Sequence, residues 1–398
     1  MRQTIPQRWA TAALLLLCAA SLIGCASFHK EAPSKYVYVT SKQTFLRDRV
    51  AAVSNRTATV ENGDKLKVLE HGRRFIKVQT AKGEVGWIDE KLVVTGDVLA
   101  EFDALKAARK DDPVVATAVV RDEVYLHLAP GRESEHYYRL AEGEKLSLLQ
   151  RATLTKPASP NAAHAQKAIP QAFGSTAAKV KPGKPVAKPE TDEPAPPVME
   201  DWWLVRDSHG DTGWLYARMM DVDAPDSIVR YSEGQRIVGA YVLETVNDPE
   251  ANETGGVNVP VYVTVMSPYV AGLPYDFDQV RVFTWNLKKH RYETGFREQH
   301  IEGYLPVTVT KSIDRYAQPG STGWEAAPTF TVKVLAAGAP PVTPDPATGA
   351  MVPSKTITQT FRLEGERIRR VSAPGAPPDA VAHPPVIEEK KSKEKKRH

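Results

Sequence analysis

The sequence of 398 residues predicts an all-β protein with a single bridging helix. Apolar and polar residues alternate along many short stretches, which is the two-residue period of a half-buried strand. Turns that contain glycine separate these stretches. The pattern is also repeated, because residues 36–94 match residues 116–220 once an insertion is removed. We therefore expect two small β barrels, followed by a C-terminal β-sandwich.

The repeat is defined by four short stretches that align in order. These are residues 44–47 with 124–127, 62–69 with 142–149, 75–78 with 202–205, and 83–88 with 210–215. Strands this short close on one another, because closure removes their unpaired edges. Each copy ends in a strand that carries Gly-Trp and an aliphatic residue. A tryptophan fills much of so small a core, so we expect Trp87 and Trp214 to be core residues.

The order of a glycine turn, a hairpin and a Gly-Trp-aliphatic strand resembles the bacterial SH3-like domain. The resemblance implies one barrel at residues 36–95 and a second at residues 113–222. It also implies a class of partner, since many domains of this family target the cell wall and hold peptidoglycan peptides.

Two segments separate or interrupt the barrels. Residues 152–201 are rich in Ala, Pro and Lys and bury too little apolar surface to offset their ordering entropy. We predict that they form a disordered loop of the second barrel. Residues 96–112 place apolar side chains such as Phe102 and Leu105 at helical spacing, which predicts a bridging helix that packs on a barrel.

The C-terminal part, residues 227–372, predicts a β-sandwich whose family the sequence does not identify. Seven strands are expected, at residues 236–246, 257–266, 279–287, 292–298, 304–309, 329–335 and 355–363. Residues 286–290 predict a hairpin turn. Residues 373–398 form a Pro-rich and then basic tail, expected to be disordered. The alternative for the tail is a contact with anionic envelope polymer or lipid headgroups.

The N-terminus has the zones of a bacterial signal peptide. Arg2 and Arg8 precede an apolar run, residues 10–23, which is too short to cross roughly 30 Å of hydrocarbon as a permanent helix. The run ends in Leu22-Ile23-Gly24-Cys25, which resembles the lipobox of bacterial lipoproteins. The resemblance implies that residues 1–24 are removed, that Cys25 is lipidated, and that residues 25–35 form a tether. The alternative is an ordinary signal peptide or membrane helix with a chance cysteine.

Membrane attachment follows from the acyl chains, which bury enough methylene groups to hold a folded domain at a bilayer. Ala26 follows the cysteine, and in an organism with two membranes the lipoprotein sorting rule then favours the outer membrane. Cys18 leaves with the signal peptide, so no internal disulfide is expected in the mature chain.

The sequence contains none of the common catalytic or cofactor-binding motifs, so we expect neither an enzyme nor a cofactor. No cysteine is free as a nucleophile, and none of the ten histidines forms a metal-binding pair on a helix. His290 with Glu293 and Asp276 with Asp278 are the nearest approaches to a metal or calcium site. A net charge of +4 with interspersed acids excludes a nucleic-acid footprint. A hydrolase or accessory enzyme remains a lesser alternative.

Binding is the function that the sequence favours, through aromatic residues near the hairpin loops. The candidates in the second copy are Tyr125, Tyr137, Tyr138, Trp202 and Trp203, and those in the first copy are Phe45 and Phe75. Strand neighbours point to opposite faces, so either Trp202 or Trp203 leaves the barrel core. That side chain then covers the insertion, packs on another domain or lines a groove. His127 is interpreted as a satisfied strand residue.

The sequence therefore predicts a non-catalytic envelope protein, anchored to a membrane through Cys25, that binds peptidoglycan peptides or an envelope protein. The alternative is a protein-binding subunit of an envelope assembly or secretion complex.

Overall fold

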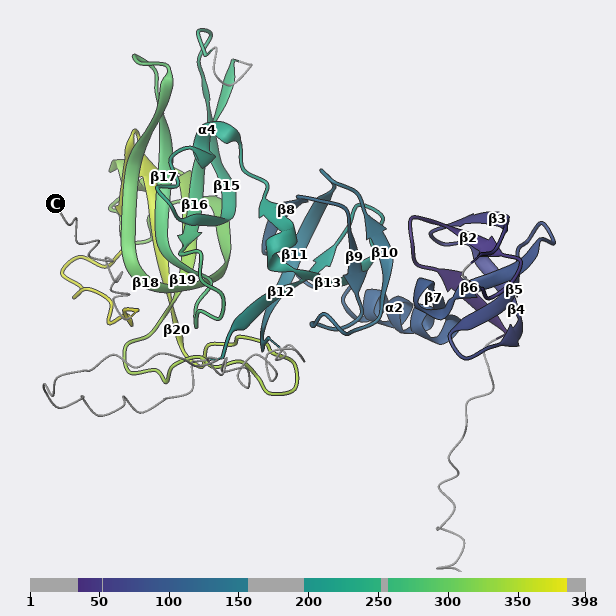
Figure 1. Ribbon diagram of the computed structural model, residues 1–398. Helices are drawn as coiled ribbons and strands as arrows, with labels where there is room; N and C mark the ends of the chain where they lie inside the picture. Colours follow the sequence, from purple (N-terminus) through teal and green to yellow (C-terminus); the bar gives the residue numbers. More distant parts are fainter. Residues whose placement is uncertain (1–34, 52, 157–196, 252–256, 385–398) are drawn as a thin grey trace, which may run out of the picture. The chain divides into compact units, whose positions relative to one another are not determined.

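A computed structural model describes residues 35–51, 53–156, 197–251 and 257–384. Cys25, the signal peptide, most of the predicted insertion and the last part of the basic tail lie outside these residues. The chain divides into two compact units, Met1–Gly96 and Asp97–His398, which are described separately. Within the described residues the strands form three antiparallel sheets, which agrees with the predicted all-β class (Figure 1).

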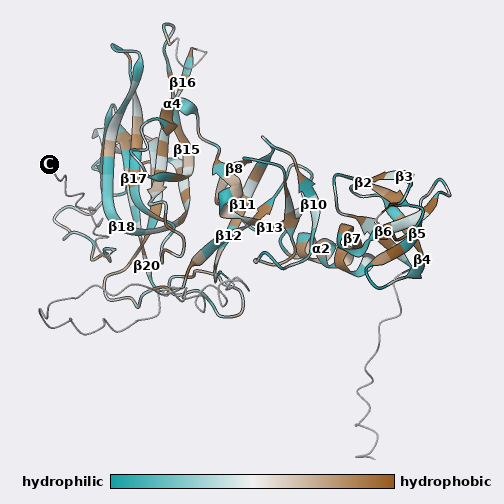
Figure 2. Cartoon of the chain, viewed as in Figure 1, coloured by the Kyte–Doolittle hydropathy of each residue, from teal (hydrophilic) through white to brown (hydrophobic). Residues whose placement is uncertain are grey.

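The first unit contains one sheet in the order β3-β2-β6-β5-β4-β1-β7. Its elements are β1 (Tyr36–Val39), β2 (Gln43–Arg47), β3 (Arg56–Glu61), β4 (Lys65–His71), β5 (Phe75–Gln79), β6 (Val85–Asp89), η1 (Glu90–Leu92) and β7 (Val93–Thr95). Alternate residues of these strands enclose one apolar core, visible as brown bands along the strands (Figure 2). That core includes Val39, Leu46, Ile76, Val78 and Ile88. The sheet thus curls around its core, as expected for a small barrel.

Gly86 directly precedes Trp87, and glycine is required at this position because strands β2 and β6 approach each other closely. A Cβ atom on Gly86 would lie 2.7 Å from Leu46 Cβ and 3.0 Å from the carbonyl oxygen of Arg47. Real Cβ atoms do not approach other atoms this closely, so only glycine fits where β2 crosses β6. Gly213 is in the same situation, 2.8 Å from Leu126 Cβ and 3.0 Å from the carbonyl oxygen of His127.

The second sheet repeats the first strand for strand, in the order β10-β9-β13-β12-β11-β8-β14. Its elements are β8 (Ala116–Val120), β9 (Val124–His127), β10 (His136–Leu140), β11 (Lys145–Thr155), β12 (Met199–Arg206), β13 (Thr212–Tyr216), η2 (Ala217–Met219) and β14 (Met220–Val222). Helix α2 (Gly96–Ala108) packs on this sheet through Phe102, which is fully buried. The predicted helix is therefore present, although it ends at Ala108 rather than at residue 112.

The loop predicted at residues 152–201 is too long at both ends, because the flanking strands extend into that range. Strand β11 continues to Thr155 and β12 begins at Met199, and these two residues are direct partners in the sheet. Part of this extension is buried: Thr153 is 1% exposed and donates its backbone N–H to the carbonyl oxygen of Gly349 at 2.8 Å. The composition of the segment could not predict this contact, because Thr153 and Gly349 are far apart in the sequence.

The third sheet contains seven strands in chain order, rather than the two stacked sheets of a sandwich. Its elements, with the short helices near them, are α4 (Asp226–Val229), β15 (Arg236–Asn247), β16 (Asn258–Ser267), β17 (Phe277–Asn286), β18 (Arg291–Ser312), η3 (Thr322–Trp324), β19 (Ala327–Leu335), β20 (Thr356–Glu364) and β21 (Arg367–Arg370). Two predicted strands are merged into β18. The predicted turn at 286–290 does connect β17 and β18.

A single sheet suffices here because it curls over one of its faces, while α4 and the residues beside it cover part of the other. In β17, Val280 and Val282 enter one apolar cluster, whereas Phe283 and Trp285 enter another with Ile228 of α4. The first cluster draws residues from β15 through β20, and β15 lies against β18 and β19 across the curl. The curl therefore supplies the second layer that a sandwich would have provided.

The second and third sheets belong to one compact unit and are joined by buried polar contacts. Arg151 donates from Nη2 to the carbonyl oxygen of Leu273 at 2.9 Å, and its Nε lies 3.1 Å from Oδ1 of Asp276. Asp276 also accepts a hydrogen bond from the backbone N–H of Leu305. Burial raises the pKa of Asp276, and the Arg151 guanidinium opposes that rise.

Asp276 is thus part of an interdomain ion pair, which does not support the weak calcium site considered with Asp278. The described residues contain no cluster of three or more acidic, histidine or cysteine side chains that could hold a metal. In the same residues, no helix is long and apolar enough to cross a bilayer.

Candidate ligand groove

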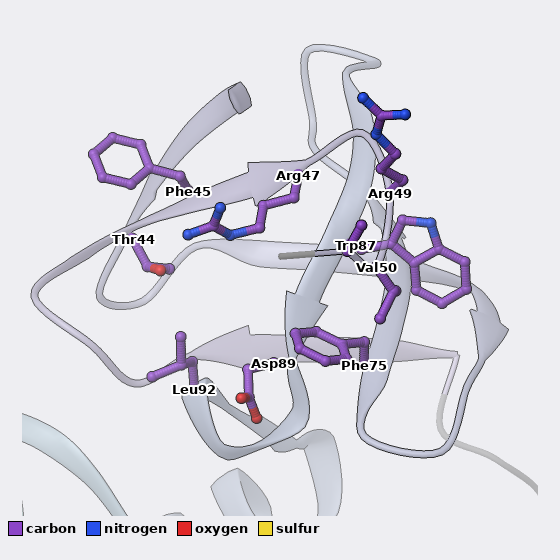
Figure 3. Close-up of a pocket in the computed structure, with 10 residues that line it drawn as sticks. Thr44, Phe45, Arg47, Arg49, Val50, Phe75, Trp87, Asp89 and Leu92 are labelled. Carbon is purple, nitrogen blue, oxygen red and sulfur yellow. The ribbon is translucent and has the colours of Figure 1, made fainter. Parts of the chain in front are cut away.

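An open groove of about 400 Å³ lies on the outer face of the first sheet (Figure 3). It is lined by Thr44, Phe45, Arg47, Arg49, Val50, Ala51, Phe75, Trp87, Asp89 and Leu92. Ligand pockets commonly have several hundred cubic ångströms and mostly apolar or aromatic walls with a few polar groups. The groove has this composition, and all of its residues lie in the first unit.

Strand alternation places the aromatic residues on this face. Arg47 of β2 is paired with Trp87 of β6, and Phe75 of β5 is paired with Asp89. Directly paired residues share a face of the sheet, so these four side chains lie together, with Phe45 two residues before Arg47.

The residues next to the groove aromatics in the sequence point the other way. Leu46, Ile76 and Ile88 are buried in the core of the first sheet. Trp87 is therefore not the core residue that the Gly-Trp motif predicted. It is half-buried and lines the groove, because Ile88 takes the interior position of β6.

Cationic side chains lie over the faces of the groove aromatics. The guanidinium carbon of Arg56 lies 3.8 Å from the centroid of the Phe45 ring, and Lys77 Nζ lies 5.9 Å from the Trp87 ring. Such contacts fix the rings and give the surrounding surface a positive charge.

The charged residues of the groove wall add to this positive charge. Arg47 donates from Nη1 to the hydroxyl of Ser54 at 2.9 Å, and Arg49 is largely exposed, with its Nε 3.9 Å from Oδ1 of Asp48. Asp89 already accepts from Arg74 at 3.2 Å and from the backbone N–H of Lys91 at 3.1 Å. The acid in the wall is thus engaged, and the groove favours an anionic ligand.

The corresponding face of the second sheet has aromatic residues at the same positions, but they are buried. Trp202 and Trp214 are 1% and 7% exposed, and both belong to one apolar cluster. His127 occupies the position of Arg47, is paired with Trp214, and lies edge-on to Trp202 with ring centroids 5.2 Å apart.

Neighbouring side chains cover this second aromatic face. Leu105 of α2 packs against the cluster of Trp202 and Trp214, as do Leu149 and Ala152 of β11. Further along the face, Arg132 lies 4.7 Å above the Tyr216 ring and pairs with the buried Glu200 at 2.9 Å. No open aromatic groove is therefore found on the described part of this face.

Burial also determines the state of His127. Burial and the nearby His136 lower the pKa of His127 to about 4, while a hydrogen bond with Ser134 acts in the opposite direction. The ring is thus neutral at pH 7 and acts as a packing residue, which agrees with its interpretation as a satisfied strand residue.

The predicted binding residues of the second copy have other roles in the structure. Tyr137 is buried and Tyr138 half-buried against Phe102 of α2, with Tyr138 edge-on at a centroid distance of 5.4 Å. Burial raises the pKa of Tyr138 well above its ordinary value. Tyr125 is half-buried beside His136. Helix α2 therefore packs on Tyr137 and Tyr138, which explains why these two tyrosines are not an open site.

Trp202 and Trp203 do point to opposite faces, as predicted, but neither is solvent-exposed. Trp203 faces the side of Ala118 and Leu148 and is 8% exposed, where it lines a small pocket together with residues 236–238 of the third sheet. Of the three roles left open for such a side chain, Trp203 takes packing on another domain. The open groove instead uses Phe45 and Phe75, which the sequence did suggest, together with Trp87, which it assigned to the core.

Comparisons with known proteins bear on the same region. The family model of the bacterial SH3 domain matches residues 44–94, a range that contains all the groove residues. No curated protein matches the chain.

Two solved structures show weak likeness. An NlpC/P60 family protein from Bacillus cereus is 10% identical, with 65% of this chain and 98% of that chain covered and a TM-score of 0.19. NlpC2 from Trichomonas vaginalis is 8% identical, with 69% and 99% covered and a TM-score of 0.14. These scores are too low to indicate a shared fold. Residues 44–94 are similar to the bacterial SH3 domain.

Proposed function

We propose that the first sheet binds a short anionic peptide of peptidoglycan in the groove of Phe45, Phe75 and Trp87. One observation carries the proposal. These aromatic residues line an open groove, whereas Trp202 and Trp214, at the positions of Phe75 and Trp87 in the second sheet, are buried. Partly exposed aromatic side chains grouped at one place are typical of a binding surface.

The chemistry of the groove suits a peptide with free carboxylates. Aromatic faces contact the peptide backbone and its small side chains, and the guanidinium groups of Arg47 and Arg49 form charge-assisted hydrogen bonds with carboxylates. Stem peptides of peptidoglycan are short, extended and rich in carboxylates. They therefore fit the groove better than a neutral or cationic peptide would.

We propose that the second sheet has a structural role and does not bind the peptide. We infer that it is a second SH3-like domain, because its strand order is that of the first sheet and Gly213-Trp214 takes the place of Gly86-Trp87. Its aromatic face is filled by α2 and β11, so its role is to hold the third sheet rather than to bind peptide.

The remaining part of the proposal concerns location. A lipid on Cys25 would place the chain in the cell envelope, where peptidoglycan is available, and residues 25–35 would act as the tether. The support for this is the Leu-Ile-Gly-Cys motif after a short apolar run. No catalytic role is proposed, since the groove has no nucleophile beside a base.

Co-sedimentation with purified, protein-free sacculi tests the proposal. The full chain should sediment with sacculi, and Trp87→Ala and Phe75→Ala should each weaken binding by about tenfold, the loss of roughly 1.4 kcal/mol expected for an aromatic contact. Trp324→Ala is the matched control, since that tryptophan is 48% exposed and lies outside the groove. Equal sedimentation of all three variants would contradict the assignment. Binding only when envelope proteins are present would indicate a protein partner instead.

A further inference from the structure

Three titratable side chains meet at one end of the third sheet, where the turn between β17 and β18 contacts the chain that follows β15. His290 is the last residue of that turn, and Asp248 is the first residue after β15. The Nδ1 atom of His290 lies 2.8 Å from Oδ2 of Asp248, and its Nε2 atom lies 3.2 Å from Oε2 of Glu250. Each nitrogen of the ring therefore faces a carboxylate oxygen. We call these three residues the His290 bridge.

Asp248 is the fixed end of the His290 bridge, because it is only 2% exposed. Its Oδ2 atom also accepts a hydrogen bond from Nε1 of Trp285 at 2.6 Å, and its Oδ1 atom accepts from the backbone N–H of Glu250 at 3.0 Å. Its own backbone N–H donates to the carbonyl oxygen of Val257 at 2.7 Å. Trp285 is a core residue that packs edge-on against Tyr292. The carboxylate of Asp248 thus joins the imidazole to the apolar core of the third sheet.

Glu250 is the exposed end of the bridge. Its side chain is 78% exposed, compared with 34% for His290. An exposed ion pair is weak because water screens both charges, so this contact depends on the charge of the ring. The next residue, Ala251, is buried in the same apolar cluster as Trp285 and donates its backbone N–H to the carbonyl oxygen of Asp248 at 3.2 Å. Residues 248–251 therefore form a short turn that covers part of this cluster and carries Glu250.

The geometry of the His290 bridge requires a protonated ring. A neutral imidazole has one N–H group, whereas an imidazolium has two and donates to both carboxylates. In the neutral ring the single proton belongs on Nδ1, because the buried Asp248 would otherwise lose a donor that water cannot replace. The lone pair of Nε2 would then face the negative charge of Glu250, which is unfavourable. Loss of the proton therefore breaks the contact with Glu250 and keeps the contact with Asp248.

The surrounding acids favour the protonated form. The hydrogen bond to Asp248, together with the charges of Asp248 and Glu250, raises the pKa of His290 above its ordinary value of 6.5, although burial acts in the opposite direction. The hydrogen bonds from Trp285 and His290 lower the pKa of Asp248, against the effect of burial. Asp248 therefore stays ionised over the range in which His290 titrates.

The cations on the turn of His290 are engaged elsewhere or face solvent. Lys289 lies 2.7 Å and Arg291 lies 3.3 Å from the same atom, Oε1 of Glu293. Lys288 is exposed. Glu293 is thus occupied by these two cations and is not the partner of His290, although the two residues are only three positions apart.

We propose that the His290 bridge is a pH-dependent switch, in which the protonated ring holds the turn of residues 248–251 closed and the neutral ring releases it at Glu250. Because the pKa of His290 is raised, the bridge is complete below about pH 6.5 and is lost as the pH rises through the raised value. Asp248 keeps its bonds to Nδ1 and to Trp285, so the change stays local to the turn. The proposal is independent of the groove in the first sheet, whose residues lie in the other unit.

NMR and hydrogen exchange of the full chain in detergent test the proposal from about pH 5.5 to about pH 9. The ring C–H signals of His290 should titrate with a midpoint above 6.5. After correction for the intrinsic exchange rate, the amides of Glu250 and Ala251 should lose protection around the same midpoint, while those of Val263 and Val265 in β16 keep theirs. A midpoint at or below 6.5, or protection of Glu250 and Ala251 that does not follow the titration, would overturn the proposal.

His290→Asn should leave the turn released at every pH in this range. Asparagine suits the positive φ of 48° at this position and has no titrating ring. The protection of Glu250 and Ala251 should then be low and independent of pH. The same variant assigns the His290 signals. A pH dependence of wild-type size in folded His290→Asn would contradict the switch.

Glu250→Gln separates the charge of the partner from its shape. Glutamine keeps an oxygen that accepts from Nε2 but lacks the negative charge, so the titration midpoint of His290 should fall. Glu366→Gln is the matched control, an exposed acid between β20 and β21 whose replacement should leave the midpoint in place. Both side chains are exposed, so both variants should fold. Equal midpoints in wild type and Glu250→Gln would show that Glu250 does not act on the ring and would overturn the assignment.

Discussion

Trp87 of β6 and Trp214 of β13 hold the same position in two sheets of identical strand order, but only Trp87 lines an open groove. Trp87 is paired across its sheet with Arg47, and Trp214 is paired across its sheet with His127. The difference arises from what covers them. Leu105 of α2 and residues of β11 pack on the cluster of Trp214, and no such cover lies on Trp87 within the described residues of its unit.

Trp214→Ala should destabilise the second sheet by about 3 to 5 kcal/mol, the usual range for removal of a buried large aromatic side chain. Trp87→Ala should have a clearly smaller effect, because its side chain is half-buried at a groove. Urea unfolding of both variants measures the difference. Ile88→Ala is a useful reference, since it removes a true core residue beside Trp87. Similar losses for Trp87 and Trp214 would show that both are core residues.

Gly86→Ala should destabilise the first sheet by roughly 1 to 3 kcal/mol, because the added methyl group collides with Leu46 and the backbone of Arg47. Gly96→Ala is the control: a Cβ atom there meets only Tyr38 at 3.9 Å and should be tolerated. Thermal melting of the two variants is the measurement. An unchanged melting temperature for Gly86→Ala would mean that β2 and β6 do not cross closely.

The stability of the unit that contains His127 should fall as the pH is lowered from about 6.5 to 4. Burial lowers the pKa of His127 to about 4, so in this range the unfolded chain binds a proton that the folded protein excludes. Proton uptake by the unfolded state favours unfolding. The contribution of the neutral ring is present above pH 6.5 and is lost as the pH approaches 4.

His127→Gln should therefore make the unfolding free energy less dependent on pH in this window than it is in the wild type. Urea unfolding at several pH values compares the two proteins, with the exposed His209→Gln as control. An identical pH dependence in wild type and His127→Gln would exclude a buried neutral histidine at this position.

Cys25→Ser should abolish incorporation of radiolabelled palmitate and release the chain from the membrane fraction, or leave it uncleaved. The physical reason is that the acyl chains provide the membrane affinity. Cys18→Ser is the internal control and should retain the label, because that residue is removed with the signal peptide. Labelling that persists in Cys25→Ser would refute the lipoprotein assignment.

The sequence predicted strands well wherever one face of the strand is apolar. Strands β15, β16 and β20 begin and end within one residue of the expected positions. The merger of two predicted strands into β18 was missed because residues 297–302 are mostly polar or charged. Their strand character depends on backbone pairing with β17, which leaves no apolar alternation in the sequence.

Of the groove aromatics, the sequence suggested Phe45 and Phe75 but not Trp87, because alternation did not decide which neighbour enters the core. In Trp87-Ile88 and Trp202-Trp203 both neighbours are apolar, so alternation fixes that they face opposite ways but not which one enters the core. The cover over Trp202 and Trp214 comes from Leu105 of a separate helix.

The most direct test of the central claim is an NMR titration of the indole N–H signals with a soluble stem peptide of peptidoglycan. Single substitutions assign the indole signals of Trp87 and Trp214. The account predicts a large, saturable shift of the Trp87 signal and an unchanged Trp214 signal. A shift of Trp214 without Trp87, or no shift of either at saturating peptide, would contradict the assignment of the groove.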